Sequence, residues 1–455
     1  MKYLLIGILS FNSVAFGQVL NTEALYSETN HPGLCSFDDC YDLKTVTEKV
    51  EKVSFDSQEG LLDLFEARQS IKIRTGQLLP SFSLRISSPL DMFDYIPNLV
   101  GFIFPSNWFR LKESKLHAKA QEHSYISLVA NQKSMGKGLY LSTHKELINL
   151  KTLEGHILFT EQLLELMNKR FEQGEVAYED LSELKAFYSL MRADQVGLAS
   201  FLEQSSAELA YLLADVSNER TVGPVEIFLP DLRDEQKIRA KDYSEIILQA
   251  SPELKALLYL SAAAKYSKRA RAYEFLTPDS GTENAFGFGY LANIRIGLSE
   301  IEKLNIKKRA YETNLKKTLN VLVTQINTAI EIHQHISSVE ESLKYILDSL
   351  LSDFDVSSKL DINRYISVLR ENLENQQMKY NARHSYLMAK TQLERLLLNG
   401  PEYSDIASLI PTNTSSLDCY LRKENKMIKA ALSTGELNLP EEIKFEDKEL
   451  SYCIR

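Results

Sequence analysis

The chain contains a stretch of 102 residues, Leu298 to Asn399, in which neither glycine nor proline occurs. Inside a helix these residues cost about 1 and about 3 kcal/mol relative to alanine, so their absence permits unusually long helices. The first half shows a weaker form of the same feature, with no proline from Ser106 to Gly223. Helices in globular proteins average about 11–12 residues. The sequence therefore predicts two regions of long helical rods rather than a compact catalytic domain.

Composition limits the class of protein further. Of the 455 residues, 44% are hydrophobic and 25% are charged. This balance is too apolar for a disordered chain and too charged for a helical membrane bundle. The formal net charge of −10 argues against non-specific binding to nucleic acid, which needs a basic surface.

The N-terminus has the features of a secretory signal. Lys2 precedes a short apolar run at residues 3–9, and small residues occupy positions −3 and −1 before Gln18. We therefore expect residues 1–17 to be removed and the mature chain to be exported. No later segment has about 18 consecutive apolar residues, so we expect no transmembrane helix in the mature chain.

Four cysteines lie outside the long helical regions. In an oxidising compartment we expect two disulfides, Cys35–Cys40 and Cys419–Cys453, one in each terminal extension. A zinc site is the alternative for the first pair, because His31 lies nearby. That alternative lacks a second cluster of ligands at matching spacing.

The first half begins with helical and β-like segments. A helix is predicted over 43–78, with a break near Ser54. Alternation of apolar and polar residues over 81–87 then predicts a half-buried strand, and a second β-like run follows at 99–104. Together these runs predict a β hairpin within residues 81–106.

A long helix is predicted next, over residues 110–172, and a tight turn at Gln173-Gly174 leads into an antiparallel return helix. At 1.5 Å per residue the long helix would extend about 95 Å. Residues in both helices recur at alternating spacings of three and four, as in helices that pack knobs into holes. We call this row of residues the seam. Its predicted members are Leu150, Leu153, Ile157, Thr160, Leu164, Met167, Phe171, Leu181, Leu184, Tyr188, Met191, Gln195, Leu198, Leu202, Ser205, Leu209 and Leu212.

The second half repeats this order. Residues 216–251 are a connector with room for one short helix, and a helix then runs from Pro252 to about residue 276. A β-like run at 286–298 belongs to a second predicted hairpin, 279–298. A second long helix and a return helix over 361–398 follow. Their seam includes Ile336, Val339, Leu343, Ile346 and Leu350.

The two halves align as an internal repeat. Three residues at the first turn match three at the second at a constant offset of 183: Phe171, Gly174 and Asp180 match Phe354, Ser357 and Asn363. Pro80 and Pro278, which end the short helices, differ by 198 instead. The second half is therefore 15 residues shorter before its turn, and we expect the missing residues in the second hairpin.

With these features in place, the sequence resembles the TolC-like outer-membrane channel-tunnel family. Residues 170–181 are similar to the family's periplasmic tip motif: an aromatic residue, a glycine three positions later, and an acid followed by an aliphatic residue where the return helix begins. Residues 78–84 are similar to the family's helix-to-barrel entry, and 252–257 to the start of its second half. The resemblance covers about residues 57–400 and rests on the order, spacing and duplication of these motifs.

The resemblance implies a mostly helical fold with a small β part. Long antiparallel helical hairpins would form a trimeric α-barrel in the periplasm, and all protomers would contribute short strands to a shared β-barrel in outer-membrane lipid. On this reading the chain consists of a signal peptide (1–17), an N-terminal arm and short helix (18–56), a first repeat (57–215), a connector (216–251), a second repeat (252–400) and a C-terminal extension (401–455).

Members of the family are passive exit ducts of tripartite drug efflux or type I secretion. The resemblance therefore implies a homotrimer that works with a periplasmic adaptor (membrane fusion) protein. It also implies an inner-membrane transporter of RND or ABC type, which supplies the energy.

The resemblance also assigns residues to the periplasmic aperture: Phe171, Gly174, Glu179 and Asp180 at the first tip, and Phe354, Ser357, Lys359 and Asn363 at the second. We expect Glu179 and Lys359 to lie near each other. The second tip departs from the family pattern, because Ser357 replaces a glycine. Asn363 and Ile366 stand where acidic residues often occur in the family.

No catalytic or cofactor-binding constellation is found, so no enzyme and no cofactor are expected. His333 and His335 lie two apart on a predicted helix and point to different sides. We expect solvent-exposed side chains there rather than a metal-binding pair. Asp353, Asp355 and Asp361 are either a cation-attracting ring in a trimer or ordinary turn and capping residues.

Two functions stay open on the sequence. The first is an outer-membrane duct. The second is a periplasmic or outer-membrane-associated structural or adaptor protein that keeps the helical barrel without a membrane-spanning pore. The short second hairpin favours the latter, because a membrane-spanning strand needs about 9–11 residues.

Overall fold

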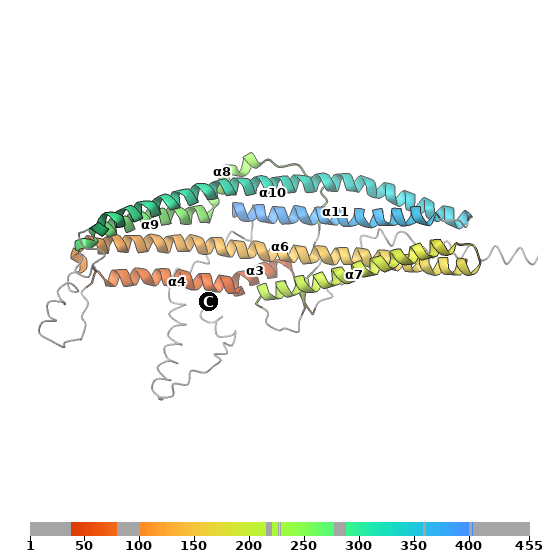
Figure 1. The fold of residues 1–455 in the computed structure, drawn as a ribbon, viewed down its shortest axis with the longest axis horizontal. Coiled ribbons are helices and arrows are strands. Elements are labelled where there is room, and N and C mark those ends of the chain that lie inside the picture. Colours follow the sequence, from red (N-terminus) through yellow and green to blue (C-terminus); the bar gives the residue numbers. More distant parts are fainter. Residues whose placement is uncertain are drawn as a thin grey trace, which may run out of the picture. The chain divides into compact units, whose positions relative to one another are not determined.

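The computed structural model describes residues 38–79, 101–214, 221–225, 227, 229–276, 288–357, 361–399 and 403. In these ranges the chain is mostly helical (Figure 1). The first half contains α3 (Leu43–Val53), α4 (Phe55–Gly76), α6 (Pro105–Glu172) and α7 (Tyr178–Leu212). The second half contains α8 (Ala240–Ala250), α9 (Pro252–Tyr273), α10 (Phe288–Ser357) and α11 (Ile362–Leu397). The other described elements are the strands β1 (Asp39–Tyr41) and β2 (Val222–Pro224) and the 3-10 turns η2 (Gly101–Ile103) and η3 (Glu274–Leu276).

Several predictions lie outside the described residues. They concern the signal peptide, the strand at 81–87, Cys35, Cys419, Cys453, Lys359 and the C-terminal extension from residue 404 onward. Among the helices that are described, none has an apolar stretch long enough to cross a membrane.

The helices of the two halves have matching lengths. α4, α6 and α7 contain 22, 68 and 35 residues, and α9, α10 and α11 contain 22, 70 and 36. At 1.5 Å per residue, each of the two longest helices extends about 100 Å. The long helices begin 183 residues apart, at Pro105 and Phe288, whereas the short helices α4 and α9 begin 197 apart. The second half is therefore shorter between the start of its short helix and the start of its long helix.

The described residues belong to two compact units, and each unit draws segments from both halves of the chain. Unit 1 contains residues 38–55, 131–249 and 315–397. Unit 2 contains residues 56–130, 250–314 and the described residues from 398 onward. The long helices α6 and α10 contribute to both units.

The core of unit 1 joins four helices. Its main cluster of buried apolar side chains includes Leu153 and Met167 of α6, Leu184 of α7, Leu347 of α10 and Tyr365 of α11. Each of these side chains is at most 2% exposed. Burial of a large apolar side chain contributes about 1.5–3 kcal/mol. The hydrophobic effect therefore holds the two helical hairpins against each other.

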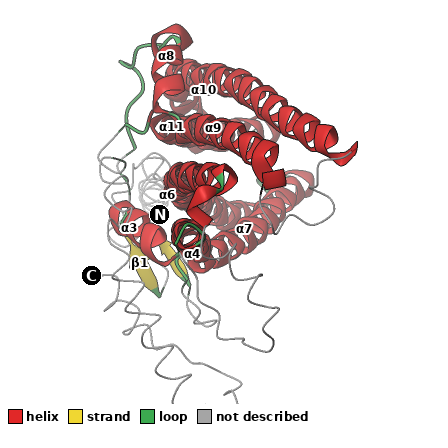
Figure 2. Cartoon of the chain, turned by 90° about the vertical axis from the view of Figure 1, so that its left-hand side faces the viewer, coloured by secondary structure: helices red, strands yellow, loops and turns green. Residues whose placement is uncertain are grey.

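A smaller cluster packs the N-terminal segment onto the same unit. Val46 and Val50 of α3 are fully buried against Leu209 of α7 and Val222 of β2. β1 and β2 pair in parallel beside this cluster (Figure 2). The predicted N-terminal arm is therefore anchored by α3, whose apolar face closes the core.

The predicted seam is mostly buried. In α6 the residues from Leu153 to Met167 at seam positions are at most 9% exposed. In α7 the same holds for Leu181, Leu184, Met191, Leu202, Ser205, Leu209 and Leu212. The prediction is wrong for Val339 of α10, which is 45% exposed. There the buried row continues instead through Leu343 and Leu347, which are four residues apart.

In the described part of unit 2, segments of four helices lie side by side in the order α4, α6, α9, α10 (Figure 2). α4 packs on α6, where the hydroxyl oxygens of Ser70 and Ser114 are 2.8 Å apart. α6 packs on α9, where the rings of His123 and Tyr259 stack with centroids 5.4 Å apart. α10 packs on the other side of α9.

The second predicted hairpin is wrong in its described part, because residues 288–298 are the first turns of α10. A helical face explains the difference. Gly297 approaches α9 so closely that a Cβ atom there would lie 3.1 Å from Lys268 Cβ. About two turns earlier, the hydroxyl of Tyr290 donates to the carbonyl oxygen of Ala272 at 2.9 Å. The alternation of aromatic and small residues concealed this helix–helix contact.

The last part of the first predicted hairpin is wrong as well, because η2 and the start of α6 occupy it. Asn107 Nδ2 donates to the carbonyl oxygen of Gly101 at 2.9 Å. Trp108 Nε1 donates to the carbonyl oxygen of Phe102 at 2.8 Å. Two carbonyl groups of the run at 99–104 therefore accept hydrogen bonds from side chains of the following helix instead of from a neighbouring strand.

Candidate functional site

The turn between α6 and α7, residues 173–177, is the first tip. Gly174 has a φ angle of +77°, and its N–H donates to the carbonyl oxygen of Phe171 at 2.9 Å. The N–H of Glu175 donates to the carbonyl oxygen of Arg170 at 3.0 Å. These two bonds form a Schellman motif, which ends a helix with a left-handed residue. A Cβ atom at position 174 would meet nothing within 4 Å, so the backbone conformation alone requires glycine.

Aromatic and acidic side chains flank the first tip. Phe171 and Tyr178 are 39% and 68% exposed, and their ring centroids are 6.1 Å apart. Glu179 and Asp180 occupy the first turn of α7, where negative charge interacts favourably with the helix dipole. Glu179 is exposed and Asp180 is half-buried. The first tip thus presents an aromatic pair and a carboxylate at its surface.

The second tip lies between α10 and α11. Asp361 precedes α11, and its Oδ1 accepts a hydrogen bond from the N–H of Arg364 at 3.1 Å. This is the geometry of an N-terminal capping residue. Of the two interpretations that the sequence left open for the aspartates at this tip, the structure supports capping for Asp361.

The other predicted residues of the second tip are only partly described. Phe354 and Ser357 lie in the last turns of α10, and Asn363 is exposed in the first turn of α11. The side chains of Phe354 and Ser357 and the whole of Lys359 lie outside the described residues. The proximity of Glu179 and Lys359 stays a prediction.

The hairpins that carry the two tips share one core within unit 1. Leu181 and Leu184, early in α7, belong to the same buried cluster as Ile362 and Tyr365, early in α11. Residues that are 181 positions apart in the sequence therefore pack together just behind the tips.

A pair of buried histidines lies further along the same hairpins. His144 Nδ1 of α6 and His384 Nε2 of α11 are 2.9 Å apart, and both residues are 0% exposed. The N–H of Ile227 donates to His144 Nε2 at 3.2 Å. Burial, followed by the neighbouring imidazole, lowers the pKa of His144 to about 3. Burial lowers the pKa of His384 to about 4.

Sequence reasoning missed this pair, because the two histidines are 240 residues apart and neither stands in a motif. Both ring nitrogens of His144 are engaged in hydrogen bonds, which leaves none for a metal ion. Among the described residues no group of three or more metal-ligating side chains comes together.

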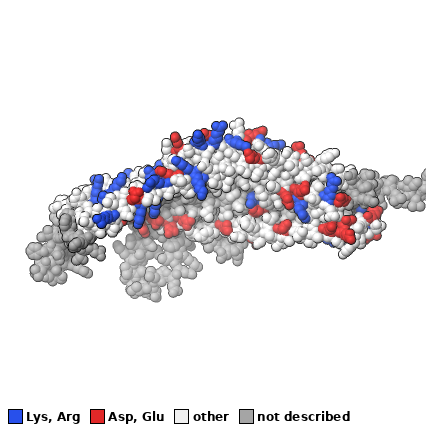
Figure 3. Space-filling view, turned by 45° about the horizontal axis from the view of Figure 1, so that its top comes forward, with Lys and Arg blue, Asp and Glu red and all other residues white. Residues whose placement is uncertain are grey.

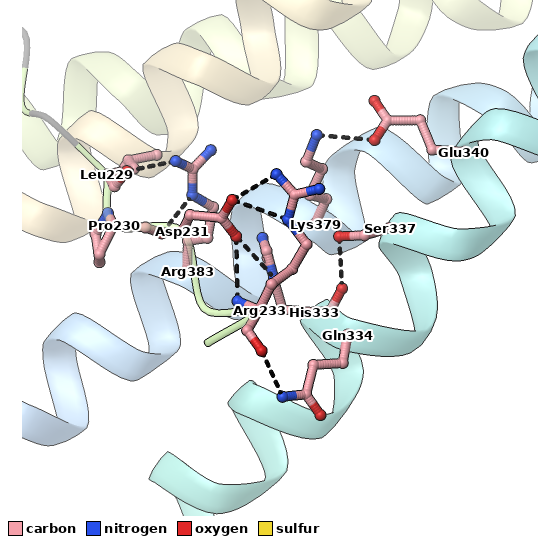
Figure 4. A network of polar contacts seen from close by, with 10 residues as sticks. All are labelled: Leu229, Pro230, Asp231, Arg233, His333, Gln334, Ser337, Glu340, Lys379 and Arg383. Atoms are coloured by element: carbon pink, nitrogen blue, oxygen red, sulfur yellow. Dashed lines mark hydrogen bonds and ion pairs between the residues drawn. The ribbon is translucent and has the colours of Figure 1, made fainter. Parts of the chain in front are cut away.

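Part of the connector, residues 229–239, is fastened along α10 and α11, and we call it the strap. Figure 4 shows the contacts of its first residues, Leu229 to Arg233. Arg383 of α11 donates from Nε to the carbonyl oxygen of Pro230 at 2.8 Å and from Nη2 to that of Leu229. Asn327 of α10 donates to the carbonyl oxygen of Ile238 and accepts from its N–H, both at 3.0 Å. Side chains of the helices thus pair with the strap's backbone in the way that a neighbouring strand would.

The strap also overturns one expectation about the histidines of α10. His335 is exposed as predicted, but His333 is 1% exposed. Its Nδ1 lies 3.9 Å from Asp231 of the strap, which covers it (Figure 4). Burial lowers the pKa of His333. A hydrogen bond from Arg233 holds the pKa of Asp231 at about 2.

One cysteine lies within the described residues. Cys40 of β1 is disulfide-bonded, and its partner lies outside the described ranges. The predicted pairs Cys35–Cys40 and Cys419–Cys453 therefore remain predictions.

Comparison with known proteins gives one kind of match. No family model matches the sequence, and no curated protein matches it. Solved structures do match. The CmeC outer membrane channel of Campylobacter jejuni superposes with a TM-score of 0.64 at 15% identity, over 80% of this chain and 87% of the channel.

Two further structures agree. The outer membrane protein VceC of Vibrio cholerae superposes with a TM-score of 0.62 at 12% identity, over 79% of this chain and 96% of VceC. The outer-membrane channel OprN gives a TM-score of 0.65 at 13% identity, over 79% and 90%. The chain therefore shares the fold of these three structures, which is built on long helical hairpins. More particularly, the chain has the TolC-like fold.

Proposed function

We propose that the protein is the outer-membrane exit duct of a tripartite efflux pump or type I secretion system. It would be a passive conduit with a long periplasmic portion, and it would act as a homotrimer. Its partners would be a periplasmic adaptor protein and an inner-membrane transporter of RND or ABC type, which would supply the energy. The observation that carries this proposal is the TolC-like fold over about four fifths of the chain.

The two tips would form the periplasmic aperture of the duct. The shared core behind them, with Leu181 and Ile362 in one cluster, supports this because it packs the two hairpins together. Glu179 and Lys359 would bias the aperture toward closure. An exposed ion pair contributes only about 0–1 kcal/mol, so the pair would influence opening without holding the fold together.

One observation favours a second candidate, a periplasmic or outer-membrane-associated structural protein without a spanning pore. Only residues 277–287 lie between η3 and α10. A membrane-spanning strand takes about 9–11 residues, so this segment has the length of one strand rather than of a hairpin. Residues 80–100, between the corresponding helices of the first half, are long enough for two.

Fractionation of the producing cell distinguishes the two candidates. A duct should remain in the outer membrane after carbonate extraction and should migrate as a heat-modifiable trimer. The structural protein should be released by carbonate or migrate as a monomer without heating. Release of the whole population from the membrane would rule out the duct.

A further inference from the structure

The described helices of unit 2 leave two edges without a described neighbour. Because α6 and α9 are the inner members of the row, α4 and α10 each have a face with no neighbouring helix among the described residues (Figure 2). An open row of amphipathic helices must cover both edges, and copies of the same row do so when one edge matches the other.

Residues on the edge of α4 recur at the spacing typical of a helix that packs against another helix. Glu59, Leu62, Glu66, Gln69 and Ile73 follow one another at steps of three, four, three and four. Gln69 is half-buried and the other four are exposed, with Leu62 and Ile73 at 50% and 64%. Alternating steps of three and four place all five on one side of a helix.

The edge of α10 has the same pattern. Ile296, Ser299, Lys303, Ile306 and Ala310 also follow at steps of three, four, three and four, and all five are exposed. Ile296 and Ile306 are 50% and 54% exposed. Each edge therefore combines two large apolar side chains with charged ones, and the sign of the charge differs between the edges.

The charges on the two edges have no partners within the described chain. Glu59, Asp63 and Glu66 of α4 form no ion pair with any described residue, and the same holds for Lys303 and Lys307 of α10. Lysine and arginine side chains gather over this part of α10 and over α9 (Figure 3). An acidic edge and a basic edge on one unit are electrically complementary to each other rather than to themselves.

Contacts inside the row show which residues lie at the same level. The neighbouring helices are antiparallel, with Ser70 opposite Ser114, His123 opposite Tyr259 and Lys268 opposite Gly297. Counting residue for residue from these contacts places position 66 of α4 level with about position 301 of α10. By the same count Ile73 lies level with about position 294.

We propose that the α4 edge of one copy packs antiparallel against the α10 edge of the next copy, with Glu66 facing Lys303. A rotation about an axis parallel to the helices moves no residue along that axis, so residues at one level in a unit meet across the joint. The register then pairs Ile73 with Ile296 and Leu62 with Ile306. One acid then meets one base between two apolar pairs, and Gln69 lies opposite Ser299.

This joint is head-to-tail, because each copy uses two different faces. Such contacts close into a ring or continue as a filament. The number of copies in the ring, three, is taken from the proposed function, and to that extent the inference rests on it. Which faces meet, and in which register, follows from the edges themselves.

A charge swap tests the joint. Glu66→Lys and Lys303→Glu, each alone, place like charges opposite one another, and each should lower the trimer fraction of detergent-purified protein about tenfold in native mass spectrometry. The two changes combined should restore the trimer. Lys265→Glu makes the same charge change at an exposed position of α9, off both edges, and should have no effect.

The outcomes separate this inference from the proposed function. If the wild-type chain forms no trimer at all, the proposed assembly fails. If the wild type is trimeric but single reversals leave it intact, or the double variant does not recover, the joint is wrong while the duct can stand. The proposed joint would also be overturned if the basic edge of α10 binds anionic vesicles instead of a second copy of the chain.

Cross-linking provides a measurement that does not depend on the charge variants being folded. In a chain carrying Leu62→Cys and Ile306→Cys, a short bifunctional maleimide should join separate copies into covalent dimers and trimers. The register would be contradicted if this chain stays monomeric after treatment. It would also be contradicted if cysteine pairs at other positions of α4 and α10 cross-link equally well.

Discussion

His144 and His384 share a hydrogen bond of 2.9 Å that joins α6 to α11 inside unit 1. The N–H of Ile227 donates to His144 Nε2, so the proton of this ring must be on Nδ1, which donates to His384. The proton of His384 is then on its own Nδ1, 2.9 Å from the carbonyl oxygen of Tyr380. Every ring nitrogen has a defined role, and the network needs both rings neutral.

This network predicts that acid destabilises the fold well above the pH at which most carboxylates titrate. An unfolded histidine binds a proton as the pH falls through about 6.5, whereas the folded pKa values are about 3 for His144 and about 4 for His384. Between these limits the unfolded state binds more protons, so stability falls as the pH falls. Each such histidine contributes up to about 1.4 kcal/mol per pH unit.

His384→Gln should therefore reduce the pH dependence of the urea midpoint between pH 6.5 and pH 5. His335→Gln, at an exposed position of α10, is the matched control and should leave the dependence unchanged. Equal slopes for wild type and His384→Gln would contradict the assigned protonation state.

Replacing glycine by alanine should have opposite effects on stability at Gly174 of the first tip and at Gly155 inside α6. Gly174→Ala should destabilise the protein by about 1 kcal/mol, because alanine is strained at a φ angle of +77°. Gly155→Ala, inside α6 where a Cβ atom also meets nothing within 4 Å, should stabilise it by about 0.5–1 kcal/mol. Urea unfolding measures both. A loss of stability in Gly155→Ala as large as that in Gly174→Ala would mean that space, not backbone conformation, decides at the tip.

Replacing the buried Asn372 of α11 by an apolar residue should stabilise the protein. Asn372 is 0% exposed, and neither atom of its amide has a hydrogen-bond partner within the described chain. Burying an unsatisfied polar group costs about 1–3 kcal/mol. Asn372→Leu should therefore raise the thermal midpoint, while Asn363→Leu, at the exposed start of α11, should not. A lower midpoint for Asn372→Leu would show that the amide has a partner in the assembled protein.

The strap depends on Arg383. Its guanidinium holds two consecutive carbonyl groups, those of Leu229 and Pro230, so Arg383→Met should free this part of the connector while keeping most of the side chain's length. Hydrogen exchange and limited proteolysis should then increase in residues 229–239 and not at the first tip. Unchanged protection of the strap would mean that Asn327 and the packing of the strap suffice to hold it.

The helices were predictable and the contacts between them were not. The break near Ser54, the end of α6 before Gly174 and the start of α11 after Asp361 all match the sequence predictions, because glycine, a polar capping residue and the 3–4 periodicity act locally. The seam identified the core for the same reason. These signals need only the neighbouring residues.

The errors come from contacts made across the fold. Residues 288–298 alternate like a strand, but Gly297 and Tyr290 pack on α9, which only the tertiary structure reveals. His333 belongs to a helix face that would be exposed without the strap. Within the candidate site, the turn geometry at Gly174 could be predicted, whereas the shared core behind the two tips joins positions 181 residues apart and leaves no local signal.

The most direct test of the central claim is electrical. Purified trimers, reconstituted into a planar lipid bilayer, should produce discrete single-channel conductance steps if the protein is an outer-membrane duct. The CmeC channel, prepared in the same way, is the reference for successful reconstitution. Trimers that insert into lipid vesicles but give no conductance, under conditions in which the reference channel does, would contradict the duct and leave the structural protein as the better account.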